Sequence, residues 1–343
     1  MKGKRLIRIT LACFVVLVVL ALVAWNSLPT TLMWYAEKTF AAKNYARAES
    51  ALRTLLAIEP KHCQAHFLYA RTLRQMARYA DAEAQLGLAA EYGLSKEEGL
   101  REYGLLYAGF DFSLAKGALQ RVLDEHPDDV EVLQALALGC MREMNAGQAE
   151  YYLQRWLETR PDDIQPLLER GRLYLDTRQF TKAIAEFREI LKRSPEHYRA
   201  HLWLGLALLS DAKVAEAEPE LRLCRQMRPD SAEPVICLAE CAIEKRDINN
   251  AYTLLFDALA LDPGSLMAMQ DLANLHLSQR RYEEAADVFT LILQDDPNDK
   301  QAHLKLAQAL TYMGRKEEAR QHEQRFRELD EKEAERAKRQ NNR

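Results

Sequence analysis

Residues 161–195 read PDDIQPLLERGRLYLDTRQFTKAIAEFREILKRSP, and this stretch decides the fold. Its first half carries an apolar stripe, L-x3-G-x2-Y, over residues 167–174, and a polar break follows at 176–179. A second stripe, A-x3-F, occupies residues 183–187. Spacings of three and four residues are typical of one apolar helix face. Proline lacks an N–H and restricts its predecessor, so it ends the second helix. The stretch therefore predicts a helical hairpin that closes at a proline.

The same pattern recurs on both sides of this stretch with a constant period. An alanine lies twelve residues before each proline of the series, and a large apolar residue lies four residues after that alanine. Pro60 precedes the series by two periods less one residue. The six regularly spaced prolines are Pro127, Pro161, Pro195, Pro229, Pro263 and Pro297. This register indicates internal duplication of one hairpin.

Counting from the prolines predicts nine hairpins. Their ranges are 29–62, 63–95, 96–129, 130–163, 164–197, 198–231, 232–265, 266–299 and 300–333. The second is one residue short, and Gly93 is expected to cap its second helix. Glu102 and Tyr103 replace the usual large-small pair in the third, so we expect the least regular structure at residues 90–112. The ninth ends in a polar helix suited to cap the stack, followed by a polar tail at 334–343.

Composition agrees with an all-α protein. The 343 residues are 48% hydrophobic and 29% charged, with only 13 glycines, 11 prolines and 8% aromatics. Few glycines, prolines and aromatic residues disfavour all-β and nucleotide-cradling folds. A net charge of −4 provides no basic face for nucleic acid, so we expect no nucleic-acid partner.

The repeat resembles the tetratricopeptide repeat, whose period is about 34 residues and whose small, large and terminal proline positions are the same. The resemblance covers residues 29–333. It implies a right-handed superhelical solenoid of about nine helix-turn-helix hairpins, with a concave groove that binds a peptide or partner protein. The family's clamp for chaperone tails uses Lys and Asn at set groove positions. It is not expected here, because those positions are Met33 and Glu37.

The resemblance also implies which residues line the groove, because the family uses four positions of each first helix. The alternative is that some of these positions pack against the next first helix. A second candidate patch is Phe67, Arg71 and Arg74. The candidate groove residues are Leu138, Met141, Leu168, Arg172, Leu175, Arg199, Leu202, Leu206, Leu209, Ile236, Glu240, Ile243, Asn274 and Leu277.

The N-terminal segment predicts a membrane anchor. Residues 6–26 carry no charge apart from Arg8 and are mostly apolar, and about 20 helical residues span the hydrocarbon core. Basic residues gather in and beside the stub at 1–5, so the repeats are expected outside, on the periplasmic face of a bacterial inner membrane. A cleaved signal peptide is the alternative. Five cysteines after the span are an unusual, odd number for an exported domain.

Signals for chemistry are weak. The chain contains no G-x-S-x-G, Walker glycine loop, G-x-G-x-x-G or H-E-x-x-H sequence, so we expect no enzyme activity, metal or cofactor. Two histidine pairs have i, i+4 spacing, His62 with His66 and His197 with His201. Because they recur in repeat register, they are interpreted as packing residues. Cys237 and Cys241 share this spacing, and a redox role is left open.

Together these patterns predict a non-enzymatic, membrane-tethered interaction scaffold that binds a protein or peptide. Two alternatives stay open. The chain is an obligate accessory subunit of an envelope assembly or secretion complex, or it is a soluble exported repeat protein after signal cleavage.

Overall fold

The computed structural model of the chain describes residues 27–341, which form eighteen helices and no strand. The all-α class is therefore confirmed for this part of the chain. Residues 27–41 form the first helix. The others are α2 (Tyr45–Ile58), α3 (Cys63–Gln75), α4 (Tyr79–Glu91), α5 (Lys96–Tyr107), α6 (Phe112–Glu125), α7 (Val130–Arg142), α8 (Ala146–Thr159), α9 (Gln165–Asp176), α10 (Phe180–Arg193), α11 (Tyr198–Ser210), α12 (Val214–Met227), α13 (Glu233–Glu244), α14 (Ile248–Leu261), α15 (Leu266–Ser278), α16 (Tyr282–Asp295), α17 (Lys300–Tyr312) and α18 (Lys316–Asn341).

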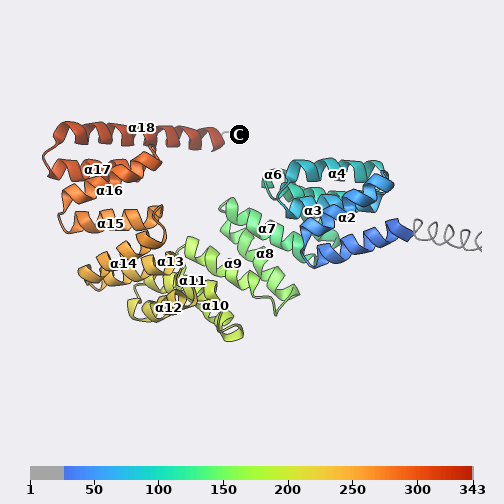
Figure 1. Cartoon of the computed structure of the whole chain (residues 1–343), viewed down its shortest axis with the longest axis horizontal. Helices are drawn as coiled ribbons and strands as arrows, with labels where there is room; N and C mark the ends of the chain where they lie inside the picture. Colours follow the sequence, from blue (N-terminus) through green and yellow to red (C-terminus); the bar gives the residue numbers. More distant parts are fainter. Residues whose placement is uncertain (1–26, 342–343) are drawn as a thin grey trace, which may run out of the picture. The chain divides into compact units, whose positions relative to one another are not determined.

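The described residues divide into two compact bodies, an N-terminal body that ends at Asp163 and a C-terminal body that begins at Ile164. In the N-terminal body α3 packs against α4, α5 against α6 and α7 against α8. In the C-terminal body the pairs run from α9–α10 to α17–α18, and Figure 1 shows these helices following one another as hairpins. Within each body the second helix of a pair also contacts the first helix of the next. This is the stacking of a repeat solenoid. The right-handed superhelical sense stays a prediction.

Helices α10 and α12 end where the sequence places a proline. Ser194, which precedes Pro195, has φ −139° and ψ 85°, and Arg228, which precedes Pro229, has φ −137° and ψ 83°. A proline ring imposes this extended backbone on the residue before it. The prolines therefore set the boundaries between these hairpins.

The turns inside many hairpins pass through a residue with positive φ. Arg178, Ala212, Arg246 and Arg280 have φ between 57° and 60°, and Gly314 continues this series at the same interval with φ 79°. For a non-glycine residue this conformation costs roughly 1–2 kcal/mol. Packing of the two helices that the turn joins must offset that cost.

Small residues on first helices receive large residues from second helices. A Cβ at Gly171 would lie 2.5 Å from Phe187, and a Cβ at Gly205 would lie 2.6 Å from Leu221. Phe187, Leu221 and Ala183 are fully buried. The small and large positions of the repeat thus meet between the two helices of one hairpin.

The predicted irregularity at residues 90–112 is present. Gly93 has φ 102° directly after α4, and the amide of Leu94 donates to the carbonyl of Ala89 at 2.9 Å, which is a glycine C-cap. In the α5–α6 turn, residues 108–111 include no residue with positive φ. The third hairpin therefore turns differently from its neighbours.

The sequence predicts a membrane helix at the N-terminus and a polar tail at the C-terminus. The stub at 1–5 and the membrane helix at 6–26 lie outside the described residues, so the anchor stays a prediction. Among the helices that the structure describes, none has the length and hydropathy needed to cross a bilayer. The polar tail predicted at 334–343 is helical as far as Asn341, where α18 ends. Helix-forming Glu, Lys, Arg and Ala fill this stretch, and no proline ends it.

Candidate functional site

Three consecutive first helices of the C-terminal body, α11, α13 and α15, line one pocket of about 390 Å³. Five predicted groove residues contribute to it: Leu206, Leu209, Glu240, Ile243 and Asn274. The remaining lining residues are Ser210, Glu244, Asp271, Leu275 and Ser278. We call this pocket the α11–α15 groove.

The repeat period explains why these side chains meet. Leu206, Glu240 and Asn274 stand one repeat period apart, and Leu209 and Ile243 form a second such series. Equivalent positions of stacked hairpins lie side by side, so one helix face is continued by the next. The three apolar side chains are half-buried and Asn274 is exposed, so the groove is open to solvent.

The groove is acidic as well as apolar. Burial, together with nearby Asp271 and Glu244, raises the pKa of Glu240 to about 7. Burial also raises the pKa of Asp271, and the Oδ2 atom of Asp271 is buried without a hydrogen-bond partner. Of the described residues that line the groove, none is Lys, Arg or His. The groove carboxylates therefore have no basic residue among the other described residues that line the groove.

Several other predicted groove residues are interior rather than open. Leu168, Leu202 and Ile236 also lie one repeat period apart, and all three are buried. Within the C-terminal body α9 packs on α11 and α11 on α13, so this register position is covered by the adjacent first helix. For these residues the packing alternative describes the structure. Met141, in the N-terminal body, is buried too.

The other predicted groove residues do not line the α11–α15 groove. Leu138, in the N-terminal body, is half-buried, as are Leu175 and Leu277. Arg172 is half-buried and pairs with Glu169 at 3.3 Å. Arg199 is exposed.

The second predicted patch is a structural ion network. Arg74 donates to Glu102 at 2.5 Å and to Glu131 at 2.7 Å, while Arg71 lies 3.8 Å from Glu102. Phe67 contacts Arg71, whose guanidinium carbon lies 5.7 Å from its ring centroid. The Glu102 side chain is fully buried, and burial raises its pKa. Arg74 is therefore committed to a buried carboxylate and is not a free cation for a partner.

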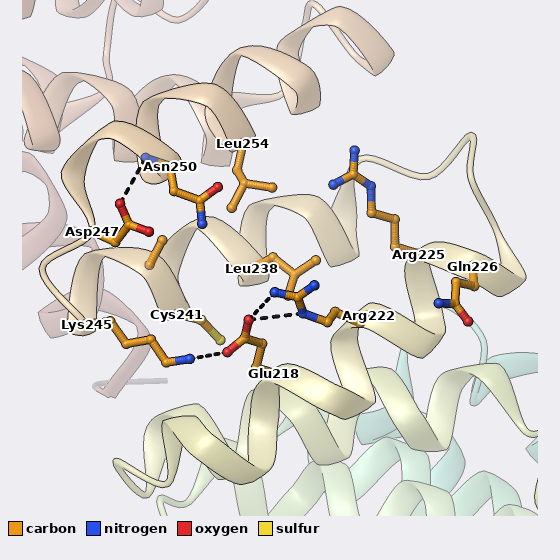
Figure 2. Close-up of a pocket in the computed structure, with 11 residues that line it drawn as sticks. Glu218, Arg222, Arg225, Gln226, Leu238, Cys241, Lys245, Asp247, Asn250 and Leu254 are labelled. Atoms are coloured by element: carbon orange, nitrogen blue, oxygen red, sulfur yellow. Dashed lines mark hydrogen bonds and ion pairs between the residues drawn. The ribbon is translucent and has the colours of Figure 1, made fainter.

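A larger pocket, which the sequence did not predict, lies among α12, α13 and α14. It has a volume of about 480 Å³, and Figure 2 shows its lining side chains. Glu218 accepts from Arg222 at 2.5 Å and pairs with Lys245, and Arg225 pairs with Asp257 at 3.0 Å. Glu218, Arg222 and Lys245 thus pair within the pocket, while Arg225 pairs with a carboxylate outside its lining. No sequence motif marks this pocket, because its residues come from three helices.

The paired histidines have distinct hydrogen-bonding roles. His62 and His197 cap α3 and α11, since each Nδ1 accepts an amide of the first turn at 3.1 Å. Nε2 of His66 bonds the carbonyl of Pro60 at 2.9 Å, and Nε2 of His201 bonds that of Pro195. Nδ1 of His66 bonds Gln85 and Nδ1 of His201 bonds Glu220, so each reaches the second helix of its own hairpin. The interpretation of these histidines as packing residues therefore missed that His66 and His201 link the loop at the proline to the second helix of the hairpin by hydrogen bonds.

One exposed cluster could offer metal ligands. Glu97, Glu125 and His126 each place one ligand atom within 4.8 Å of the others. His126 bonds Glu97, and this hydrogen bond raises the pKa of His126. Protonation competes with metal binding, so the arrangement favours an ion pair.

The cysteines of the described chain are free. Cys140, Cys224, Cys237 and Cys241 are buried. Burial raises the pKa of Cys224 to about 12 and that of Cys241 to about 11, and it raises the pKa of Cys237 well above the ordinary value. Thiolates are the reactive form, so these thiols suit packing better than redox chemistry.

Comparison with protein-family models identifies repeats in much of the described chain. Two models described as tetratricopeptide repeat match residues 168–232 in one case and residues 242–303 and 276–338 in the other. A model of the anaphase-promoting complex, cyclosome, subunit 3 matches residues 12–89.

Curated relatives are distant. DnaJ homolog subfamily C member 3 from Mus musculus is 22% identical over 245 residues, 67% of this chain and 48% of that protein. The Homo sapiens protein of the same name is 21% identical over the same shares. The chain thus spans about half the length of the curated relatives it matches.

Solved structures share the fold. The C-terminal part of a TPR repeat-containing protein from Cytophaga hutchinsonii aligns with a TM-score of 0.51 and 22% identity, covering 70% of this chain and 99% of that one. A tetratricopeptide repeat protein from Parabacteroides merdae aligns with a TM-score of 0.52 and 14% identity, covering 73% and 99%. Tetratricopeptide repeat models thus match two stretches within residues 168–338, and solved tetratricopeptide repeat proteins share the fold.

Proposed function

We propose that this chain is a non-enzymatic scaffold that binds a partner protein or peptide in the α11–α15 groove. Tetratricopeptide repeat proteins generally mediate protein–protein interaction. The observation that carries the proposal is the convergence of Leu206, Leu209 and Ile243, from consecutive hairpins, on one open pocket of about 390 Å³. Apolar side chains at the centre of an interface supply affinity when a partner excludes water from them.

The proposal includes a membrane tether at residues 6–26, with the repeats on the periplasmic side. It is supported by the apolar run and by the basic residues that precede it. A tether of this kind would hold the groove, and any partner in it, close to the membrane surface.

The groove is tested by capture of interacting proteins from membranes with wild-type chain and with the double variant Leu206→Ser/Leu209→Ser. The matched control is Leu223→Ser/Leu261→Ser, which changes two leucines that are exposed elsewhere in the C-terminal body. We expect the groove variant to lose a partner that wild type and control retain, with unchanged helical circular dichroism in all three. Equal capture by the groove variant would contradict the proposal.

A further inference from the structure

The acids of the α11–α15 groove differ from Glu186 and Glu218, two other half-buried acids of the C-terminal body. Glu186 pairs with Arg170 at 2.9 Å, and Glu218 pairs with both Arg222 and Lys245. Each of these carboxylates therefore has a cation within its own body. Neutralisation inside the fold lowers the cost of removing a carboxylate from water.

Glu240, Glu244 and Asp271 lack such partners. Among the described residues, none of the three side chains takes part in an ion pair with Lys, Arg or His, although Glu240 and Asp271 are half-buried. Asp271 comes from α15, and the other two come from α13. Their negative charges therefore gather at one place in the groove, and the fold provides nothing opposite to them.

The apolar wall lies beside this charge. Leu206 and Leu209 come from α11 and Ile243 from α13, and all three line the same pocket as the acids. A long basic side chain combines the two properties that such a pocket requires, because it has an aliphatic stem and a cationic end. The stem would cover apolar surface while the cationic end meets the carboxylates.

We propose that the groove accepts a lysine or arginine side chain of a partner segment whose adjacent residues are aliphatic. This inference rests on the proposed function, since it names the chemistry of the partner in the same groove. Acidic segments are excluded by like-charge repulsion with Glu240, Glu244 and Asp271. The contact is worth more than a surface ion pair because the acids are partly desolvated.

The test is selection of peptides from a random heptapeptide display library on the full chain held in mild detergent. The double variant Glu240→Gln/Asp271→Asn removes two groove charges while keeping side-chain shape. Its matched control is Glu283→Gln/Asp287→Asn, which removes two exposed charges from α16 of the same body. A third variant, Leu206→Ser/Leu209→Ser, alters the apolar wall.

We expect wild type and control to select peptides with a Lys or Arg between aliphatic residues. Replacement of that basic residue by Gln should weaken binding to wild type by about tenfold or more. The same replacement should have a smaller effect on the Glu240→Gln/Asp271→Asn variant, because two of the three groove charges are gone and only Glu244 remains.

Two results would overturn different parts of the account. Selected peptides that lose binding to the Leu206→Ser/Leu209→Ser variant but carry no basic residue would contradict the partner chemistry and leave the groove standing. Selected peptides that bind this variant as tightly as wild type would contradict the proposed function itself.

Discussion

At the scale of single residues, the N-terminal body contains a buried carboxylate, Glu102, whose charge is stabilised by ion pairs. The Glu102 side chain is fully buried and accepts from Arg74, whose side chain is 11% exposed. Removing one member of a buried pair leaves the other charged and unpaired, which is far more costly than losing both. The pair therefore acts as a unit in the stability of the third hairpin and its neighbours.

Arg74→Met is accordingly expected to lower the free energy of unfolding by about 3–5 kcal/mol. Adding Glu102→Leu to this variant should restore much of the loss, because no buried charge is then left. Urea unfolding of both variants, followed by circular dichroism, measures the difference. Equal stability of the single and double variants would show that Glu102 needs no cation.

Glu240 predicts a pH dependence of stability. Its pKa of about 7 in the folded chain exceeds the ordinary value for glutamate, so folding favours the protonated carboxyl. The protonated Glu240 carboxyl contributes fully to the free energy of unfolding below about pH 4.3, and this contribution is lost as the pH rises through 7. Glu240→Gln should therefore raise the free energy of unfolding by about 1–2 kcal/mol at pH 8 and change it less at pH 5. A variant that is destabilised at pH 8 would contradict this. Binding groups often reduce stability in this way.

At the scale of elements, α18 is held to α17 by a contact between two imidazoles. Nε2 of His303 bonds the carbonyl of Pro297, and Nδ1 of His303 lies 2.8 Å from Nδ1 of His322. One of these Nδ1 atoms must lack a hydrogen for the contact to form. Burial and nearby His303 lower the pKa of His322, while Glu318 on the same helix opposes this.

The sign of this shift predicts acid weakening of the α17–α18 contact. The contact contributes stability above about pH 6.5, and that contribution is lost as the pH falls below it. The variant His322→Gln offers a control from the chain itself, because Gln85 occupies the equivalent position opposite His66. We expect the melting temperature of wild type to fall more between pH 7.5 and 5.5 than that of His322→Gln. Identical shifts would show that His322 does not destabilise the fold at acid pH.

The helices and their ends could be predicted from the sequence because their signals are local. Pro195 and Pro229 restrict the residue before them wherever they stand, and Gly93 supplies a positive φ. The turns at Arg178 and Ala212 could not be predicted, since neither residue prefers the left-handed region. Their conformation follows from the packing of the helices on either side.

The candidate site was predictable only in part, because the period assigns a register but not what covers each position. Leu206 and Glu240 line one pocket, whereas Leu168 and Ile236, which the register assigned to the same surface, are buried. Asp271 was missed because its importance depends on Glu240, which belongs to a neighbouring hairpin. Contacts between residues of different hairpins can be identified only from the three-dimensional structure.

At the scale of the whole molecule, about nine-tenths of the chain consists of one repeated helical hairpin. The N-terminal residues 6–26 are predicted to be a membrane tether. Repeat units bury their apolar faces against neighbours, so terminal units need a polar outer face. The polar helix α18 suits the C-terminal end of the stack. The apolar residues 6–26 precede the first described helix.

The tether predicts an orientation that can be measured. Basic residues precede the apolar run, and none follows it until Lys38, so the repeats should be exported. Alkaline phosphatase fused after residue 343 should be active in bacterial cells, and a β-galactosidase fusion at the same point should be inactive. The opposite pattern would place the repeats in the cytoplasm.

The central claim is that the α11–α15 groove holds the partner, and site-specific photo-crosslinking tests it most directly. A photoreactive amino acid would replace exposed Asn274 in the groove or, as a control, exposed Thr253 on α14. After irradiation of membranes, the account predicts a partner adduct from position 274 and none from position 253. An adduct from position 253 alone, with the partner still captured by the chain that carries the photoreactive residue at position 274, would contradict it.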